Sequence, residues 1–500
     1  MLAGISVKEL MVECGVAFGT SGARGEVTAM TDRVCYGYTQ GFLSYLAEQG
    51  EFSPGGRVAI AGDLRPSTPR ILAACARAIR DLGGLPVFCG YVPTPALALF
   101  SFAESIPSLM VTGSHIPADR NGIKFYRPTG EVLKTDEAGM SRQVLALPVD
   151  TFTQDGALVS SEALPPITDV EGAYAQRYLD HFGTAALAGK RIGVYQHSAV
   201  GRDLLAKVLL GLGAEVTLLG RSETFVPVDT EAIRPADVDL AREWANGGQF
   251  DAIVSTDGDS DRPLLADQHG TWLRGDVLGI LCAARIGAAS VVTPVSSNTA
   301  LEMSGRFARC RRTRIGSPYV IAAMMEEQQT GSPIVCGYEA NGGFLLGTDI
   351  PGADGSMTRA LPTRDAFLPI LLVLTDPEAS ITEQLSALPK RFTFSERLTP
   401  FPAALSKRLF DMLLAGGSDE QVALQTLLFG HFGGEAQSID LTDGVRATFA
   451  SGLVIHLRGS GNAPELRCYT EADTEGGARD ANGLALGVVR AMLLEDAPTA

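Results

Sequence analysis

One serine of the sequence stands where it could carry a phosphoryl group. Residues 109–112 form a short apolar run, a glycine follows that permits a sharp turn, and Ser114 and His115 come next. Ligands of α/β sheets bind at the carboxyl ends of strands, so the end of this run is a suitable place for a reactive serine. An Asn–Gly pair at residues 121–122 predicts a tight turn that returns Lys124 toward Ser114. A serine hydroxyl near a cation can form a covalent phosphoryl intermediate; the alternative is that it only bonds local backbone amides.

Three aspartates at alternate positions form a second candidate site. Residues 257–262 read DGDSDR and follow the apolar run 252–254. Carboxylates this close repel one another unless a cation neutralises them, and carboxylate oxygens are preferred ligands of Mg²⁺. A calcium helix–loop–helix site requires glycine and glutamate where Arg262 and Gln268 stand, so that class is excluded. We therefore expect Mg²⁺ at this loop, the alternative being a polar turn with solvated charges. The expected ligands are Asp257, Asp259 and Asp261.

A loop of small residues carries a carboxylate and an amide. Residues 337–347 read GYEANGGFLLG and include Glu339 and Asn341. These two groups could accept a hydrogen bond from one sugar hydroxyl and donate one to another. As an isolated motif it is weak, because a simple polar loop has the same composition.

A fourth segment predicts an anion site. Residues 458–471 read RGSGNAPELRCYTE and follow the apolar stretch 452–457. Guanidinium groups, a hydroxyl and bare backbone N–H groups together suit a phosphate, whereas the alternative is a surface turn with arginines exposed to water. The candidate anion-binding residues are Arg458, Ser460, Gly461, Asn462 and Arg467.

The elements that must position these loops repeat along the chain. An apolar strand, a polar turn, an amphipathic helix, a glycine stop and a second strand follow one another in residues 57–90 and again in 191–220, with a weaker copy from residue 289. Such units build sheets with parallel pairs covered by helices. We predict an α/β protein of four domains around a central cleft: three similar mixed-sheet α/β domains and a distinct C-terminal α+β domain. The predicted domains are residues 1–150, 160–268, 269–380 and 388–500.

The composition of the chain limits the binding partners and the cellular location that we expect. The chain has 500 residues and a formal net charge of −16, which disfavours binding to nucleic acid or anionic lipid. No apolar run of about 18 residues is present, so no membrane span is expected. The N-terminus does not resemble a secretion signal. The eight cysteines are scattered without zinc-ligand spacing, which indicates reduced thiols and a cytoplasmic location.

Four motifs in order resemble the α-D-phosphohexomutase family, the phosphomannomutases and phosphoglucomutases, over essentially the whole length. The family's serine loop usually reads T-A-S-H-N-P…N-G-x-K, and this chain has TGSHIPADRNGIK at residues 112–124. The metal loop D-G-D-x-D-R is DGDSDR, and the phosphate loop R-x-S-G-T-E-P…R is RGSGNAPELR. The N-terminal T-S-G-x-R-G is intact at residues 20–25.

The resemblance implies a phosphomannomutase activity that interconverts mannose 1-phosphate and mannose 6-phosphate. Ser114 would be the phosphoserine, and its phosphate would join the three aspartates in holding Mg²⁺. Arg24 and Arg262 would contact the transferring group, Lys124 would handle a proton, and His115 would support the loop. Glu339 and Asn341 would bind sugar hydroxyls, and the segment from Arg458 to Arg467 would hold the other phosphate. A hexose 1,6-bisphosphate would be intermediate and activator.

Three positions of this chain depart from the family pattern. Ile116 replaces the usual asparagine after Ser–His. Gly343 stands where many members carry a histidine, and Asn462–Ala463 replaces Thr–Glu. The alternatives are a phosphoglucomutase or phosphoglucosamine mutase, a metal-dependent sugar phosphatase, and a non-catalytic sugar-phosphate binder. The oligomeric state is not readable from the sequence.

Overall fold

The computed structural model describes residues 4–19, 21–414, 430–432, 436–460 and 464–493. The chain forms two compact units, of which the first comprises residues 1–291 and 316–384. The second comprises residues 292–315 and 385–500. The limits of four domains that the sequence suggested remain a prediction.

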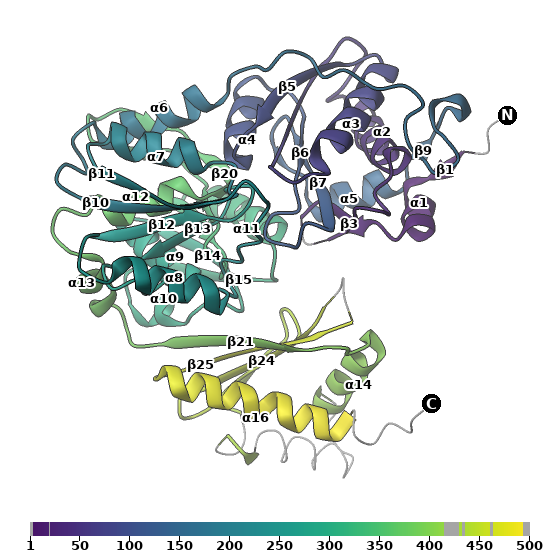
Figure 1. Ribbon diagram of the computed structural model, residues 1–500. Helices are drawn as coiled ribbons and strands as arrows, with labels where there is room; N and C mark the ends of the chain where they lie inside the picture. The colour runs from purple at the N-terminus through teal and green to yellow at the C-terminus, as the bar shows by residue number, and fades with distance from the viewer. Residues whose placement is uncertain (1–3, 20, 415–429, 433–435, 461–463, 494–500) are drawn as a thin grey trace. The chain divides into compact units, whose positions relative to one another are not determined.

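The first part of the first unit is a sheet covered by helices. Its elements are β1 (Ile5–Ser6), α1 (Val7–Cys14), β2 (Ala17–Phe18), β3 (Ala23–Glu26), α2 (Asp32–Glu48), β4 (Arg57–Gly62), α3 (Thr68–Asp81), β5 (Leu85–Tyr91), α4 (Thr94–Ala103), β6 (Ser108–Val111), β7 (Arg120–Arg127), β8 (Gly130–Glu131), α5 (Lys134–Ser141), β9 (Val144–Leu145) and the 3₁₀ turn Val149–Thr151. The main sheet has the order β2-β3-β7-β6-β4-β5, and β8 pairs with β7. β4 is parallel to β5 and β6. β7 is antiparallel to β6 and β3, and these three strands are labelled in Figure 1.

The predicted helical face of α3 is confirmed. The predicted face consists of Ile71, Leu72, Cys75, Ile79 and Leu82. The first four are fully buried in the core, whereas Leu82 is the C-cap residue and packs partly buried against the same core. Gly83 adopts φ +77°, a left-handed conformation that glycine reaches without strain, and the helix ends just before it.

The predicted tight turn at Asn121–Gly122 is wrong. Both residues lie inside β7, where Asn121 pairs with Gly25 and Gly122 pairs with Arg24 of β3. The chain reverses earlier, between the end of β6 at Val111 and the start of β7. Glycine is needed at 122 for close packing, because a Cβ there would lie 2.7 Å from the Ala23 carbonyl oxygen.

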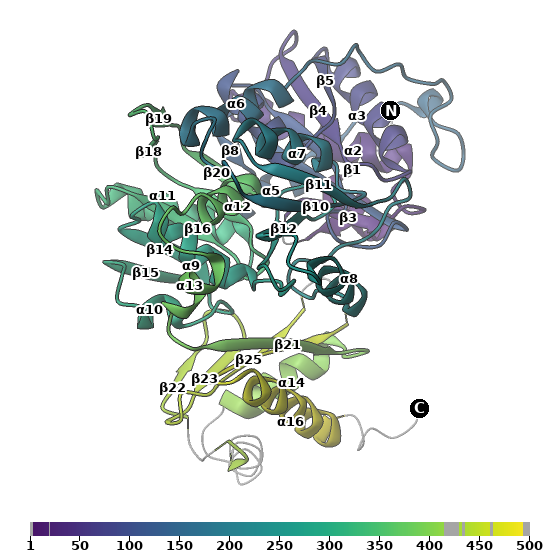
Figure 2. The same ribbon diagram turned by 60° about the vertical axis from the view of Figure 1, so that its left-hand side comes forward.

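The second part of the first unit repeats the strand–helix–strand order. Its elements are α6 (Glu171–Phe182), β10 (Arg191–His197), α7 (Arg202–Gly211), β11 (Glu215–Arg221), α8 (Pro235–Ala245), β12 (Ala252–Thr256) and β13 (Pro263–Ala266). The sheet order is β11-β10-β12-β13, with β13 antiparallel and the other pairs parallel. α7 packs on β10 and β11 (Figure 2) and buries Leu205, Val208 and Leu209, as the sequence predicted.

The third part of the first unit carries residues 337–347, the candidate sugar-binding loop, which we call the sugar loop. Its elements are α9 (Gly275–Arg285), α11 (Ser317–Gln329), β16 (Val335–Tyr338), β17 (Phe344–Leu346), β18 (Ile350–Pro351), β19 (Met357–Thr358), β20 (Leu361–Asp365), α12 (Phe367–Leu374) and α13 (Ile381–Ser386). β17 lies between β16 and β20 and is antiparallel to both. The strand β14 (Ser290–Pro294) crosses the boundary of the two units.

The second unit contains an antiparallel sheet with helices. Its elements are α10 (Ala300–Met303), β15 (Arg309–Thr313), β21 (Phe392–Leu398), α14 (Ala403–Leu414), β22 (Ser438–Asp440), β23 (Val445–Thr448), β24 (Val454–Gly459), β25 (Leu466–Ala472) and α16 (Glu475–Leu493). The sheet order is β21-β25-β24-β23-β22, and α14 and α16 pack against it (Figure 1). The apolar residues near positions 485–494 predict a short last helix, but α16 begins ten residues earlier, at Glu475.

None of the helices in the described ranges combines the length and the apolar character that crossing a membrane requires.

Candidate active site

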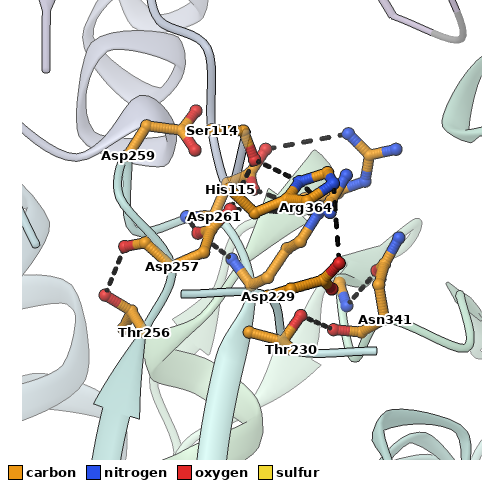
Figure 3. A network of polar contacts seen from close by, with 12 residues as sticks. Ser114, His115, Asp229, Thr230, Thr256, Asp257, Asp259, Asp261, Asn341 and Arg364 are labelled. Atoms are coloured by element: carbon orange, nitrogen blue, oxygen red, sulfur yellow. Dashed lines mark hydrogen bonds and ion pairs between the residues drawn. The ribbon is translucent and has the colours of Figure 1, made fainter. Parts of the chain in front are cut away.

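The serine loop and the metal loop meet inside the first unit. Ser114 follows β6 with φ +55°, a conformation that is uncommon for a residue other than glycine. Its hydroxyl donates a hydrogen bond to Asp257 Oδ2 at 2.5 Å, and its backbone N–H donates to Thr112 Oγ1 at 2.8 Å. Ser114 is fully buried together with Asp257, so the reactive hydroxyl is held against the aspartates and away from bulk water (Figure 3).

A buried arginine that the sequence reading did not identify holds the serine loop in this shape. Arg65 follows β4, forms an ion pair with Asp63 at 3.1 Å, and donates hydrogen bonds to four backbone carbonyls of the loop. Those carbonyls belong to Ser114, Ile116, Pro117 and Arg120. A Cβ at position 113 would lie 2.6 Å from Arg65 Cζ, so Gly113 is required by this contact. The available signal was an Asp-x-Arg sequence directly after an apolar strand.

The three predicted metal ligands lie together on the loop between β12 and β13. One carboxylate oxygen from each of Asp257, Asp259 and Asp261 lies within 4.8 Å of the others, and all three residues are buried. The backbone N–H groups of Asp261 and Arg262 both donate to Asp257 Oδ1 at 3.2 Å, which fixes the loop.

Lys124 contributes a positive charge to this cluster. Its Nζ lies 2.6 Å from Asp259 Oδ2 and also contacts Asp261 Oδ2. Burial alone would raise the pKa of Asp259, but Lys124 holds that pKa well below its usual range. Burial, reinforced by the charges of Asp259 and Asp261, raises the pKa of Asp257 well above its usual range. One lysine therefore does not neutralise all three carboxylates.

The donor set fits a divalent cation. Among the described residues, Asp259 Oδ1 and Asp261 Oδ1 are buried oxygens without a hydrogen-bond partner. Lys124 contacts the other oxygen of each carboxylate, and Arg262 Nε lies 3.7 Å from Asp261 Oδ1, which is too long for a hydrogen bond. Both oxygens can therefore still accept a metal ion as a ligand. Hard oxygen ligands of this kind are typical of Mg²⁺ sites that keep positions for substrate oxygens.

Arg262 and His115 connect the two loops a second time. Arg262 Nη1 lies 2.8 Å from His115 Nδ1, and because a guanidinium can only donate, Nδ1 accepts and the ring proton stays on Nε2. Nε2 faces Asp229 Oδ2 at 3.9 Å. Burial lowers the pKa of His115 to about 3, with the charge of Arg262 acting in the same direction, so this ring is neutral at physiological pH.

Arg24 of β3 lies among the same charges. Burial, together with the charges of Arg262 and Arg364, lowers the pKa of Arg24 to about 10, although Asp259 and Asp261 act in the opposite direction. Arg24 is therefore cationic at neutral pH and belongs to the electrostatic environment of the metal loop.

The sugar-loop residues are joined to the metal loop by Arg364, which the sequence reading missed. Arg364 Nε donates to Glu339 Oε2, and Nη1 lies 3.7 Å from Asp261 Oδ2. A Cβ at position 343 would lie 2.6 Å from Arg364 Cδ, so Gly343 leaves room for this buried guanidinium. Asn341 is held on the same loop by a hydrogen bond from the Gly343 N–H to its Oδ1 at 2.9 Å.

The predicted phosphate loop lies in the second unit. Arg458 of β24 pairs in register with Arg467 of β25. Arg458 forms an ion pair with Asp443 at 2.9 Å, and Arg467 forms one with Glu465 at 2.7 Å. The Ser460 N–H donates to the Glu465 carbonyl oxygen at 2.9 Å. Gly461 and Asn462 lie outside the described residues.

Comparisons with known proteins agree with these motifs. Residues 15–145, 176–270 and 274–392 match α/β/α domains I, II and III of phosphoglucomutase/phosphomannomutase. The chain is 44% identical to a phosphomannomutase of Salmonella muenchen, with 93% of this chain and 94% of the relative covered. It is 43% identical to a phosphomannomutase of Sinorhizobium fredii, with 94% and 98% covered.

Solved structures have the same fold. A phosphoglucomutase/phosphomannomutase family protein from Burkholderia thailandensis matches with a TM-score of 0.69 at 19% identity, covering 94% of this chain and 97% of the other. An N-acetylphosphoglucosamine mutase from Aspergillus fumigatus in complex with glucose 1,6-bisphosphate matches with a TM-score of 0.59 at 14% identity, covering 98% and 100%. The predicted fold class, three similar α/β domains followed by a distinct α+β domain, is confirmed. The chain therefore belongs to the phosphoglucomutase/phosphomannomutase family, the α-D-phosphohexomutases.

Proposed function

We propose that this protein is a phosphomannomutase that interconverts mannose 1-phosphate and mannose 6-phosphate. The observation that supports the proposal is the 2.5 Å hydrogen bond from the Ser114 hydroxyl to Asp257 Oδ2, because it brings a nucleophilic hydroxyl to the aspartate cluster. Two phosphomannomutases that are 44% and 43% identical over nearly the whole chain support the choice of mannose.

Ser114 would carry the phosphoryl group and transfer it to the free hydroxyl of a hexose monophosphate. The Oγ–P bond breaks, a bond from the sugar oxygen to phosphorus forms, and the product is a hexose 1,6-bisphosphate. The bisphosphate turns end for end, and its other phosphoryl group returns to Ser114. The glucose 1,6-bisphosphate bound by the Aspergillus fumigatus mutase supports this class of intermediate and activator.

The cations of the site offset the charge that spreads over the transferring group. We infer that Arg24 and Arg262 contact this group. Mg²⁺ held by Asp257, Asp259, Asp261 and the phosphate on Ser114 would supply further charge neutralisation when bound. Burial lowers the pKa of Lys124, but Asp259 and Asp261 outweigh that effect and raise it, so Lys124 is protonated. Lys124 would therefore give a proton to Ser114 Oγ as the phosphoryl group leaves, and the proton that the attacking sugar hydroxyl loses would restore the charge of Lys124. The same transfers run backward in the reverse step.

Binding of the sugar and of its second phosphate is assigned to two loops. Glu339 and Asn341 would contact sugar hydroxyls in both orientations of the intermediate. The phosphate that does not react would be held by Arg458, Ser460, Gly461, Asn462 and Arg467. We place the enzyme in the cytoplasm, which the eight free cysteines support.

Side-by-side turnover of three substrates tests the function. The purified protein is assayed with mannose 1-phosphate, glucose 1-phosphate and glucosamine 1-phosphate, with glucose 1,6-bisphosphate as activator. We expect the highest kcat/KM with mannose 1-phosphate. A preference for glucosamine 1-phosphate would reassign the substrate, and steady release of inorganic phosphate would indicate a phosphatase instead.

A further inference from the structure

Residues 222–230, which we call the bridging segment, contain none of the motifs that identified the site. The segment follows β11 and precedes α8 in the second part of the first unit. Its last two residues, Asp229 and Thr230, nevertheless contact two different loops of the site (Figure 3). Asp229 faces His115 of the serine loop, and Thr230 bonds Asn341 of the sugar loop.

Asp229 is held so that one carboxylate oxygen faces the histidine. Its Oδ1 accepts hydrogen bonds from the N–H groups of Glu231 at 2.9 Å and Ala232 at 3.2 Å. The other oxygen, Oδ2, lies 3.9 Å from His115 Nε2. Since Arg262 donates to Nδ1, the ring proton is on Nε2 and points toward this carboxylate. The distance is too long for a direct hydrogen bond, so the contact orients the ring electrostatically.

Thr230 makes a direct contact with the sugar loop. Its hydroxyl donates a hydrogen bond to the Asn341 carbonyl oxygen at 2.6 Å, and Thr230 is buried. A buried carbonyl that loses its donor is costly, so this hydrogen bond fixes the position of the loop backbone at Asn341.

The same segment also contacts Arg65, the residue that holds the serine loop. The guanidinium of Arg65 lies 4.0 Å from the centre of the Phe225 ring, a cation–π contact. Arg65 in turn binds the Ser114 carbonyl oxygen at 2.8 Å. The bridging segment thus contacts His115 and Arg65, which both adjoin Ser114, and it also contacts the backbone of the sugar loop.

We propose that Asp229 and Thr230 are positioning residues that set the placement of the Ser114 loop relative to the sugar loop. The inference rests on the proposed function, because the proposed function makes the Ser114 loop the phosphoryl donor and the sugar loop the binding site of the acceptor sugar. Phosphoryl transfer requires the donor and the acceptor hydroxyl to be aligned closely, and a small misplacement lowers the rate of the chemical step. Loss of the bridge therefore lowers kcat more than it raises KM.

The first experiment removes and restores the hydroxyl of Thr230. Thr230→Val keeps the shape of the side chain and deletes the donor, whereas Thr230→Ser keeps the donor. With mannose 1-phosphate as substrate, we expect T230V to lower kcat about tenfold with KM changed less than about twofold. T230S should retain most of the wild-type kcat. Thr224→Val, at an exposed threonine of the same segment, is the matched control.

The second experiment tests whether Asp229 acts through His115. Asp229→Asn keeps an oxygen for the two backbone N–H groups and removes the charge that faces the ring. We expect D229N and His115→Phe each to lower kcat, and the double variant to be no worse than H115F alone, because residues that act as one unit are not additive. Additive losses would overturn the role of Asp229.

The outcomes separate this inference from the proposed function. Wild-type protein without mutase activity would refute the proposed function itself. If the wild-type protein turns over mannose 1-phosphate but T230V is fully active, or T230V and T230S lose equal activity, only the positioning role of Thr230 is refuted. Thermal unfolding of each variant identifies any loss of activity that comes from loss of the fold.

Discussion

The Ser114 hydroxyl donates to Asp257 Oδ2 at 2.5 Å, although 143 residues separate the two along the chain. The first belongs to a loop after β6, and the second belongs to a loop after β12 of a different sheet. The two loops are therefore brought together by packing within the first unit. Lys124 of β7 makes the same connection through Asp259 and Asp261.

Removal of the Ser114 hydroxyl should abolish turnover and spare binding. Ser114→Ala deletes the phosphoryl carrier, so mutase activity should fall at least about 1,000-fold. Mannose 1-phosphate binding, measured by calorimetry, should remain within about threefold of wild type, since the sugar and phosphate loops are unchanged. Near-full activity in S114A would exclude the phosphoserine role.

The metal loop should be essential for turnover. Asp259→Asn removes a carboxylate whose Oδ1 is buried without a hydrogen-bond partner in the described part of the chain, and kcat should fall about 100-fold. Removal of divalent cations with a chelator should abolish wild-type activity, and added Mg²⁺ should restore it. Asp239→Asn makes the same charge change at an exposed position and should turn over like wild type. Unimpaired turnover of D259N would contradict the assignment.

A methyl group at position 343 should displace Arg364. The Cβ of Gly343→Ala would lie 2.6 Å from Arg364 Cδ, and the guanidinium would lose its contacts with Glu339 and Asp261. Overpacking of this kind costs about 1–3 kcal/mol, and we expect kcat to fall about tenfold. Gly476→Ala is the control, because nothing lies within 4 Å of the added Cβ. Equal behaviour of the two variants in the mannose 1-phosphate assay would show that Gly343 is not needed for room.

Acid should destabilise the fold through a buried histidine of the second unit. Burial lowers the pKa of His456 to about 4, and its ring nitrogen Nε2 donates to the Asp443 carbonyl oxygen. A histidine whose pKa is depressed in the folded state contributes stability that is present above pH 6.5 and is lost as the pH falls toward 4. At pH 5 the loss amounts to about 2 kcal/mol.

Thermal unfolding at pH 7 and pH 5 measures this contribution. His456→Gln should reduce the drop in Tm between the two pH values, because the group that takes up a proton on unfolding is gone. His269→Gln removes an exposed histidine and serves as the control. A drop in Tm as large in H456Q as in wild type would contradict the prediction.

Much of the local structure and of the site could be predicted from the sequence. The apolar faces of α3 and α7 have a helical period, and the chemistry-bearing loops follow apolar strands, where α/β sheets place ligands. The turn predicted at Asn121–Gly122 failed because Gly122 serves close packing against the Ala23 carbonyl oxygen. The same pair of residue types is compatible with a turn and with a strand, and local sequence does not decide between them.

The order of four motifs along the chain was by itself sufficient to assign the family and the residue types of the chemistry. Only the tertiary structure showed that Arg65 holds the serine loop and that Arg364 fills the space beside Gly343. It also showed that Asp229 faces the serine loop and that Thr230 contacts the sugar loop. These residues belong to no motif, because their partners lie on loops far away in sequence. Contacts of that kind depend on sheet register and on packing between elements, and neither is encoded in the periodicity of a single segment.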